Sequence, residues 1–543
     1  YSAGWNKYLL GSYEQNEDGS YSYTTNRVGN EVSTDLNSTN ETAGDRRIYL
    51  EAMVDYNRTF GRHDVNAMLL YNQDELVNNV PGNNLINSLP KRKQGLAGRL
   101  SYAYDGKYMA EVNMGYNGSE NFAKGHRWGF FPSIALGYNI SEESFFEPLR
   151  KVITSMKLRG SWGLVGNDQI GGERFIYMPT INLSGKGFTT GIDQNYGLSG
   201  PVYTRYENNS ITWEVGEKIN LGIDLQLLNS LNIVVDIFRE TRRDIFQKKG
   251  TIPTYLGTGN TDVFGNLAEM KNQGLDLSID YNKAFSKDFY MNFKGTFTYA
   301  HNEITKYDEA PKYAFQSKVG QSANVSQGYL SNGLFLDEAE IDRYNQQMGS
   351  TLGAGDIKYL NVSNMHGYGD DIVDVDDWTW IGNPTVPEIV YGFGPSFKYK
   401  NWDFSFFFQG VAKTSLFMSG FHPFGDNSLR NVLQFVANDR WSPTNQNVDA
   451  KYPRLTRKTS LNNTNPGNSG RTSDYWMRDG SFLKLKNMEL GYTFKRMRFY
   501  ISGSNLLTFS KFDLWDPEQG GGSGLKYPTQ RVFNVGFQMT FNN

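Results

Sequence analysis

The sequence predicts an all-β protein built as an antiparallel transmembrane β-barrel, with long extracellular loops and short periplasmic turns. Three observations lead to this fold class. Apolar and polar residues alternate in many segments, long and short connections alternate between those segments, and no apolar run approaches the ~18 residues that a membrane-spanning helix requires. A strand between lipid and a wet interior has one apolar and one polar face, so hydropathy alone does not reveal it.

The composition excludes several classes of function. The chain has 543 residues, too many for one ordinary soluble domain, and its net charge of -3 gives no basic surface, so nucleic acid is not an expected partner. Cysteine is absent, which excludes disulfides, thiolate metal sites and a cysteine nucleophile. Tyr1 to Leu10 already reads like a strand and has no basic start of a signal peptide.

The predicted strands have two different faces. Between Phe289 and Tyr299, phenylalanine and methionine residues share one face, while Asn292, Lys294 and Thr296 share the other. The same alternation recurs along the chain, in Ile48–Phe60, Asp64–Gln73, Gln94–Asp105, Leu231–Glu240, Gly274–Asn282, Phe289–His301, Ile389–Lys400, Trp402–Gly410, Phe499–Leu507 and Arg531–Phe541. Charged residues opposite aromatic residues are typical of a barrel wall.

The connections between these strands fall into two groups. Short turns follow one end of the strands, as at 61–63, 228–230, 284–287, 400–401 and 495–496. Long, polar, glycine-rich loops follow the other end, at 14–45, 165–211, 304–386, 415–480 and 508–528. Outer-membrane barrels sort their connections in this way, and counting back from the last strand gives about sixteen strands.

Two helices are expected outside the wall. In Ser141–Lys151, Ser141 is a candidate N-cap, two glutamates occupy the first turn, and Pro148 should keep the helix short or kinked. In Asp337–Gln347 a second helix is expected within an outer loop.

Several motifs resemble the SusC/RagA-like family of TonB-dependent outer-membrane transporters of Bacteroidota. The resemblance rests on seven segments in the family's order: Leu89–Ser133, Ile153–Asp168, Thr212–Leu228, Gly355–Tyr359, Ile381–Phe393, Ser473–Phe494 and Phe499–Glu518. It covers nearly the whole chain.

The resemblance implies a bacterial outer-membrane barrel of about 22 strands, of which residues 1–543 form the C-terminal part. The TonB box, the plug and the first strands would precede them. It also implies a SusD-like surface lipoprotein as a lid, energy supplied through TonB, contact with outer-membrane lipid, and import of oligosaccharides or peptides. The alternative from the residues alone is a soluble or surface glycan-binding adhesin.

The acidic loop from His366 to Asp377 is a candidate metal site. The resemblance places an EF-hand-like run here, and Asp370, Asp374 and Asp376 (or Asp377) would supply oxygen ligands for Ca²⁺. His366 replaces the leading carboxylate of that run. A solvated acidic loop without metal is the alternative.

Aromatic residues in the outer loops are candidates for binding substrate. Their rings could stack on the apolar faces of sugars, and the candidates are Tyr196, Tyr203, Tyr206, Trp441, Trp476 and Trp515. The alternative is that these rings pack the loops together or contact the lid.

The sequence does not predict an enzyme. None of the five histidines has HExxH spacing, and no GxSxG motif is present. A barrel enzyme would instead need a nucleophile and a base together at the rim.

Overall fold

The computed structural model describes residues 7–28, 44–79, 85–170, 174–253, 255, 262–344, 346–347, 352–368, 370–420, 424, 431–456 and 472–541. The chain divides into two compact units. The first comprises Tyr1–Glu51 and Asn72–Lys93, and the second comprises Ala52–Tyr71 and Gln94–Asn543. The first unit contains a hairpin of β1 (Lys7–Gln15) and β2 (Tyr21–Val28) and the short helix α1 (Leu85–Ser88).

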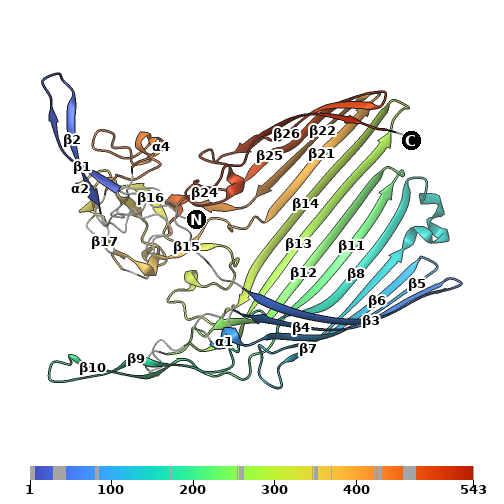
Figure 1. The fold of residues 1–543 in the computed structure, drawn as a ribbon, viewed down its shortest axis with the longest axis horizontal. Coiled ribbons are helices and arrows are strands. Elements are labelled where there is room, and N and C mark those ends of the chain that lie inside the picture. The colour runs from blue at the N-terminus through green and yellow to red at the C-terminus, as the bar shows by residue number, and fades with distance from the viewer. Residues whose placement is uncertain are drawn as a thin grey trace. The chain divides into compact units, whose positions relative to one another are not determined.

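Long antiparallel strands dominate the second unit, and Figure 1 shows β8, β11, β12, β13 and β14 running side by side. The sheet order is β27-β26-β25-β22-β21-β14-β13-β12-β11-β8-β7-β6-β5-β4-β3, which makes fifteen strands. Their bounds are β3 Asp45–Phe60, β4 His63–Asn78, β5 Lys91–Tyr104, β6 Tyr108–Ser119, β7 Trp128–Asn139, β8 Ile153–Asn167, β11 Glu214–Leu227, β12 Leu231–Lys248, β13 Phe264–Ala284, β14 Phe289–Lys306, β21 Ile389–Tyr399, β22 Trp402–Ala412, β25 Phe482–Phe494, β26 Met497–Ser510 and β27 Val532–Met539.

The all-β prediction and the alternating segments are confirmed. About sixteen wall strands were expected, whereas this sheet has fifteen. The difference lies at the start of the chain, because β1 pairs with β2 in a separate two-stranded sheet within the described residues. Alternation predicts a strand but does not say which strand it pairs with.

Tight turns close the hairpins at one end of the sheet. Leu227 pairs with Leu231, Tyr399 with Trp402, and Phe494 with Met497. Each turn uses left-handed backbone, with φ of 52° at Lys400 and 55° at Lys495. Such turns match the right-handed twist of the strands and hold the register.

The long connections carry secondary structure of their own. Residues 168–213 include the hairpin of β9 (Thr180–Thr190) and β10 (Tyr196–Arg205). The remaining elements are η4 Ala314–Gln316, β15 Ser326–Gly328, β16 Ser331–Leu334, α2 Glu338–Ile341, β17 Gln346–Gln347, β18 Ile357–Tyr359, α3 Val362–Met365, β19 Ile372–Val373, η5 Val375–Asp377, β20 Thr379–Ile381, β23 Ser415–Phe417, α4 Gln434–Asn438, η6 Asp474–Trp476, β24 Met477–Asp479 and η7 Pro517–Gln519.

The predicted helix at Ser141–Lys151 is wrong in type and in cap. Two 3-10 helices, η1 (Ile140–Glu142) and η2 (Ser144–Leu149), stand in its place, with extended Glu143 between them. Ser141 lies inside η1, and its hydroxyl donates to Asn139 Oδ1 at 2.8 Å instead of capping backbone N–H groups.

The predicted helix at Asp337–Gln347 is wrong in length. The helix ends at Ile341, and Gln346 and Gln347 pair with Ile372 and Val373 instead. Asp337 does cap it, since its carboxylate accepts from the Glu340 N–H at 2.7 Å.

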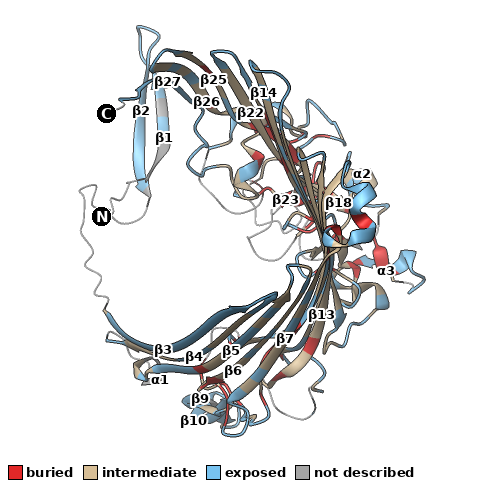
Figure 2. Ribbon diagram, turned by 90° about the vertical axis from the view of Figure 1, so that its right-hand side faces the viewer, coloured by how far each residue is buried: buried red, intermediate tan, exposed pale blue. Residues whose placement is uncertain are grey.

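Buried residues gather in the loops rather than along the strands (Figure 2). The larger core is formed by residues from the connections after β14, β22 and β26, among them Tyr329, Tyr359, Phe424 and Trp476. A smaller core joins Phe122, Ile170, Ile176, Ile211 and Trp213. Among the described residues no helix has the length and hydropathy to cross a membrane.

Candidate functional site

One face of the sheet in the second unit carries charged residues, and we call it the polar face. Lys157 and Arg159 lie on it in β8, while Leu158 and Gly160 lie on the opposite, apolar face. Directly paired residues share a face, and Gly222 of β11 pairs with Arg159 on one side and with Asp236 of β12 on the other. Three neighbouring strands therefore place an arginine, a glycine and an aspartate in one row.

Arg159 joins these strands through a charge-assisted network. Its Nη1 and Nη2 donate to Asp236 Oδ1 and Oδ2, both at 2.6 Å, and its Nε donates to Asp224 Oδ1 at 3.0 Å. Such a bidentate pair fixes direction as well as charge. The guanidinium therefore spans β11 and ties β8 to β12.

Gly222 makes this span possible because its missing side chain leaves space. A Cβ at this position would lie 2.6 Å from Arg159 Cζ and 2.8 Å from Asp236 Oδ1. The same arrangement recurs at Gly491 of β25, where a Cβ would lie 2.5 Å from Arg498 Nη2 and 2.6 Å from the Asp403 carboxylate. We call these two positions the glycine bridges.

Arg498 is the centre of the second network. Its Nε donates to Asp403 Oδ2 at 3.1 Å, and its Nη2 donates to Glu489 Oε1 at 2.6 Å. A third pair on the polar face joins Arg99 Nη2 to Glu111 Oε2 at 2.6 Å. Cross-strand pairs of opposite charge thus stabilise the polar face at three separate places.

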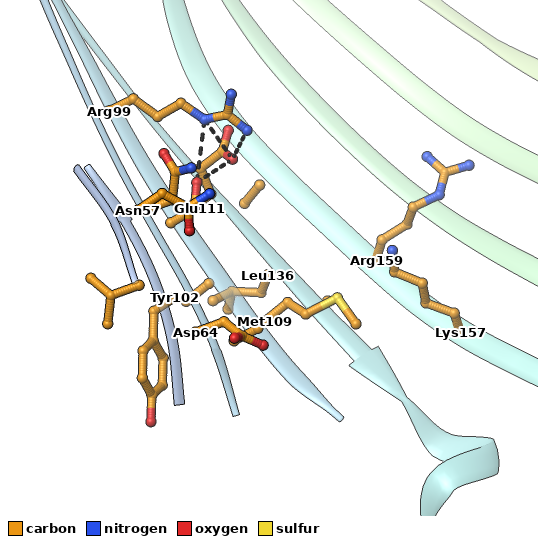
Figure 3. Close-up of a pocket in the computed structure, with 16 residues that line it drawn as sticks. Asn57, Asp64, Arg99, Tyr102, Met109, Glu111, Leu136, Lys157 and Arg159 are labelled. Atoms are coloured by element: carbon orange, nitrogen blue, oxygen red, sulfur yellow. Dashed lines mark hydrogen bonds and ion pairs between the residues drawn. The ribbon is translucent and has the colours of Figure 1, made fainter. Parts of the chain in front are cut away.

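A hollow of about 430 Å³ opens on the polar face, and we call it the polar hollow. Figure 3 shows Arg99 and Glu111 joined on one side, with Lys157 and Arg159 on the strand opposite. Lys157 has no ion pair within the described part of the chain. The lining of the hollow therefore contains the carboxylates of Asp64 and Glu111 and the ammonium group of Lys157.

The final long connection is anchored to the wall by a buried lysine. Lys484 of β25 is 1% exposed, and its ammonium donates to Asp516 and, at 2.8 Å, to Glu518 Oε2. Burial opposes ionisation of both carboxyl groups, but the hydrogen bonds from Lys484 hold the pKa of Asp516 and the pKa of Glu518 below their usual values. Gly520 to Gly522 follow directly and line an opening of about 470 Å³ with Phe417 and Phe482.

Two of the three predicted tryptophans lie in the larger loop core, and the third, Trp515, is half-buried against it. Trp476 is 0% exposed, Trp441 is 5% exposed, and Trp515 packs against the same core. Trp476 contacts Phe424 with ring centroids 5.3 Å apart. In this structure neither the Trp441 ring nor the Trp476 ring presents a face to solvent, which favours the packing alternative; a role in sugar stacking stays a prediction.

Burial in this core is strong enough to change the ionisation of its tyrosines. Removal from water raises the pKa of Tyr452 to about 12 and raises the pKa of Tyr475 further. Tyr475 donates its hydroxyl hydrogen to the Ala450 carbonyl at 2.6 Å. The core therefore contains neutral phenols.

The three predicted tyrosines are exposed on or beside the β9–β10 hairpin. Tyr196 is 63% exposed, Tyr203 47% and Tyr206 38%. The rings of Tyr203 and Tyr206 stack with centroids 5.4 Å apart. Their role in ligand binding stays a prediction.

The carboxylates of the acidic loop are used within the loop. Asp370 accepts from Asn361 and Ser363, Asp374 caps η5, and Asp376 pairs with Lys312. Asp377 is fully buried, and burial raises the pKa of its carboxyl group. Within the described residues no three acidic or histidine side chains are close enough to hold a metal ion, so Ca²⁺ stays a prediction from the sequence.

Sequence reasoning missed the glycine bridges and Lys484. The signal for Gly222 was present, since a glycine interrupts the polar face of the strand 214–227. A glycine inside a strand often marks the close approach of another group. Its partners could be named only once the register was known.

The sheet has long strands, one apolar and one charged face, tight turns at one end and folded loops at the other. This is the architecture of an outer-membrane β-barrel wall. Residues 1–506 match the family described as TonB dependent receptor-like, beta-barrel, and the chain belongs to that family. This assignment places it in the bacterial outer membrane and replaces the soluble alternative. The family is one of receptors.

Its relatives include receptors of the SusC type. It is 25% identical to TonB-dependent receptor P3 of Formosa agariphila over 95% of this chain and 54% of that protein. It is 28% identical to TonB-dependent receptor SusC of Bacteroides thetaiotaomicron over 82% of this chain and 43% of SusC. The chain thus spans about half the length of the relatives that it matches.

Solved structures agree with the fold. The RagAB peptide transporter matches with a TM-score of 0.67 at 19% identity, over 92% of this chain and 55% of that one. The RagAB peptide importer in the open-open state matches with a TM-score of 0.65. At this identity the likeness establishes the fold alone.

Proposed function

We propose that this chain forms the transport wall of an importer that takes up oligosaccharides, or peptides, through the outer membrane. The observation that supports this most directly is the polar face, where glycine bridges, cross-strand ion pairs and the polar hollow together make a charged, cross-linked surface. Transmembrane barrels place such a face toward the lumen.

The proposal includes two partners. A SusD-like surface lipoprotein captures ligand above the loops, and TonB supplies energy through a segment outside residues 1–543. The folded loop core supports the first partner, because Trp476, Phe424 and Tyr452 hold the outer connections as a fixed platform. SusC and RagAB are similar in family and fold.

Uptake by the full-length protein tests the function. The gene is deleted in its host, and uptake of fluorescent oligosaccharides and fluorescent peptides is measured in parallel, with the intact gene restored as the control. Loss of one ligand class, regained on restoration, identifies the substrate. Unchanged uptake of both classes refutes import.

A second experiment tests the lid. The full-length protein is solubilised in detergent, and a surface lipoprotein that co-purifies at a constant ratio supports the assembly. Release of the protein from cells without detergent would contradict a membrane barrel.

A further inference from the structure

The apolar face contains a hollow of about 530 Å³, close to the end of the sheet that carries the tight turns. We call it the apolar hollow. It crosses five strands and is lined mainly by apolar groups, those of Tyr102, Tyr108, Ala110, Leu136, Tyr138, Leu158, Gly160 and Leu221. The exposed fractions of Leu136 and Leu221 are 58% and 62%, so the surface is open to the surroundings.

The register explains why the hollow exists. Ala110, Leu136, Gly160 and Leu221 are directly paired in one row across β6, β7, β8 and β11. The row thus alternates a small residue with a leucine. The next row toward the turns contains Tyr108, Tyr138 and Leu158, and the row on the other side contains Val112, Ile134 and Trp162. Ala110 therefore forms a notch between two rows of large side chains, whereas Leu221 covers Gly160, where a Cβ would lie 3.2 Å from Leu221 Cδ2.

Tyrosines form the rim of the hollow nearest the turns. The rings of Tyr108 and Tyr138 stack with centroids 5.2 Å apart and 6° between their planes. The Tyr108 hydroxyl donates to Glu143 Oε1 at 2.6 Å, so its polar end points toward the connection between β7 and β8. Tyrosines with a wet end and an apolar body are typical of the membrane–water interface, which places the notch just inside the hydrocarbon.

The connection between β7 and β8 is longer and more highly charged than its neighbours. The other tight turns at this end hold four residues or fewer, whereas this one spans 140–152 and includes η1 and η2. Phe146 is buried, and Arg150 Nε donates to the Ser141 carbonyl at 2.7 Å, so the connection is held in place.

Groups of both charges and exposed apolar side chains stand on this connection. Glu143 lies 3.7 Å from Lys107, and Arg150 lies 3.8 Å from Glu142. Lys151 is exposed, and so are Phe145, at 68%, and Leu149, at 51%. A surface of this kind suits a headgroup layer in which phosphate and ammonium groups lie side by side.

We propose that the apolar hollow and the 140–152 connection together bind one zwitterionic phospholipid of the inner leaflet. An acyl chain fills the notch at Ala110 and lies along Leu136. The headgroup phosphate contacts Lys151 and Arg150, and its ammonium group contacts Glu142 and Glu143. The occupant is a bilayer lipid because this face of the barrel is in contact with hydrocarbon. The inference depends on the membrane location and not on the imported substrate.

Photolabelling tests the acyl-chain part. The full-length protein is placed in vesicles of phosphatidylethanolamine and phosphatidylglycerol that contain a trace of phosphatidylethanolamine with a diazirine in one acyl chain. After irradiation, mass spectrometry should find label on peptides covering 102–110 and 136–160. Ala110→Leu fills the notch, and we expect roughly a threefold loss of label there. The loss is modest because no hydrophobic effect drives contacts between apolar groups inside a bilayer, so only van der Waals packing is lost.

Ala67→Leu is the matched control, because Ala67 lies on the apolar face of β4 away from the hollow. It should leave the label on 102–110 and 136–160 unchanged. The proposed lipid site is wrong if Ala110→Leu is labelled as strongly as the unaltered protein. It is also wrong if Ala110→Leu and Ala67→Leu lose the same amount of label. Import should be unchanged in Ala110→Leu, so a failed lipid site and a failed transport function are told apart.

Competition tests the headgroup part. Unlabelled phosphatidylethanolamine and phosphatidylcholine should displace the probe at lower mole fraction than phosphatidylglycerol, which has no ammonium group. Lys151→Glu should weaken retention of the probe, because it replaces the phosphate contact with a like charge. Equal displacement by all three lipids, or no effect of Lys151→Glu, overturns the assignment of the headgroup.

Discussion

The glycine bridge at Gly222 gives the most direct test of how the polar face is built. Substitution with alanine places a Cβ 2.6 Å from Arg159 Cζ and 2.8 Å from Nη1, closer than real Cβ atoms approach such groups. The guanidinium must then move, and it loses its two hydrogen bonds of 2.6 Å to Asp236. The bond from Nε to Asp224 can survive this movement.

The expected loss of stability follows from these contacts. A hydrogen bond to a charged group contributes about 1.5 to 3 kcal/mol. The side chain of Arg159 is 31% exposed, so solvent screening and an alternative position of the guanidinium reduce the loss. We therefore expect Gly222→Ala to lower the free energy of unfolding by about 2 kcal/mol in total.

Urea unfolding of the full-length protein in lipid vesicles measures this loss. Gly137→Ala is the control, because Gly137 is the other residue paired with Arg159, yet its Cβ would meet nothing closer than 3.4 Å. Asp236→Asn removes the same ion pair, so Gly222→Ala combined with Asp236→Asn should cost less than the sum of the two. The reasoning is refuted if Gly222→Ala is as stable as Gly137→Ala, or if the two effects add fully.

Three further predictions concern the loops. Lys484→Met leaves Asp516 and Glu518 facing one another and should destabilise the packing of residues 508–528 by about 3 kcal/mol, measured as faster hydrogen exchange, whereas Lys486→Met at a more exposed position should do much less. The carboxyl groups of Asp516 and Glu518 have lowered pKa values in the folded protein, so the stability that they contribute is complete above their unfolded pKa values of about 4 and is lost as the pH falls through the folded values. Protease protection of this loop should therefore be constant from neutral pH to about 5 and then decrease. Loss of protection on raising the pH would contradict this prediction. Trp476→Ala should lower the stability of the loop core by about 3 to 5 kcal/mol, because this ring is fully buried. Tyr196→Ala should leave the melting curve unchanged and weaken binding of a ligand that stacks on aromatic rings. If both variants melted at the same temperature, the distinction between core and surface rings would be wrong.

The strands could be predicted from the sequence because their pattern is local. Alternation over ten residues shows the faces of β14, and a charged or aromatic residue is visible without knowing its neighbour. The tight turns are local as well, since only residues 400–401 separate β21 from β22, and only residues 495–496 separate β25 from β26. Both the strand faces and the tight turns depend only on residues that are close together in the sequence.

The loop core could not be predicted in the same way. Its contacts join distant segments, as where the Ser331 N–H donates to Asp474 Oδ1 across 143 positions. A tryptophan in a polar, glycine-rich stretch therefore looks like a surface ring until its partners are known. Trp441 and Trp476 are buried for this reason, whereas the hairpin register keeps Tyr196 and Tyr203 near the surface.

The glycines of the wall show how one sheet serves two environments. Gly222 of β11 is small so that an arginine can cross this strand on the polar face. Gly160 of β8, which pairs with Leu221 of β11, is small on the apolar face. Adjacent positions of the β8–β11 pair thus make room on opposite sides of the wall. A larger residue at 222 should disturb charge pairing toward the lumen, and one at 160 or at Ala110 should disturb lipid packing. Because alternate residues point to opposite faces, the two surfaces can change independently while the register stays the same.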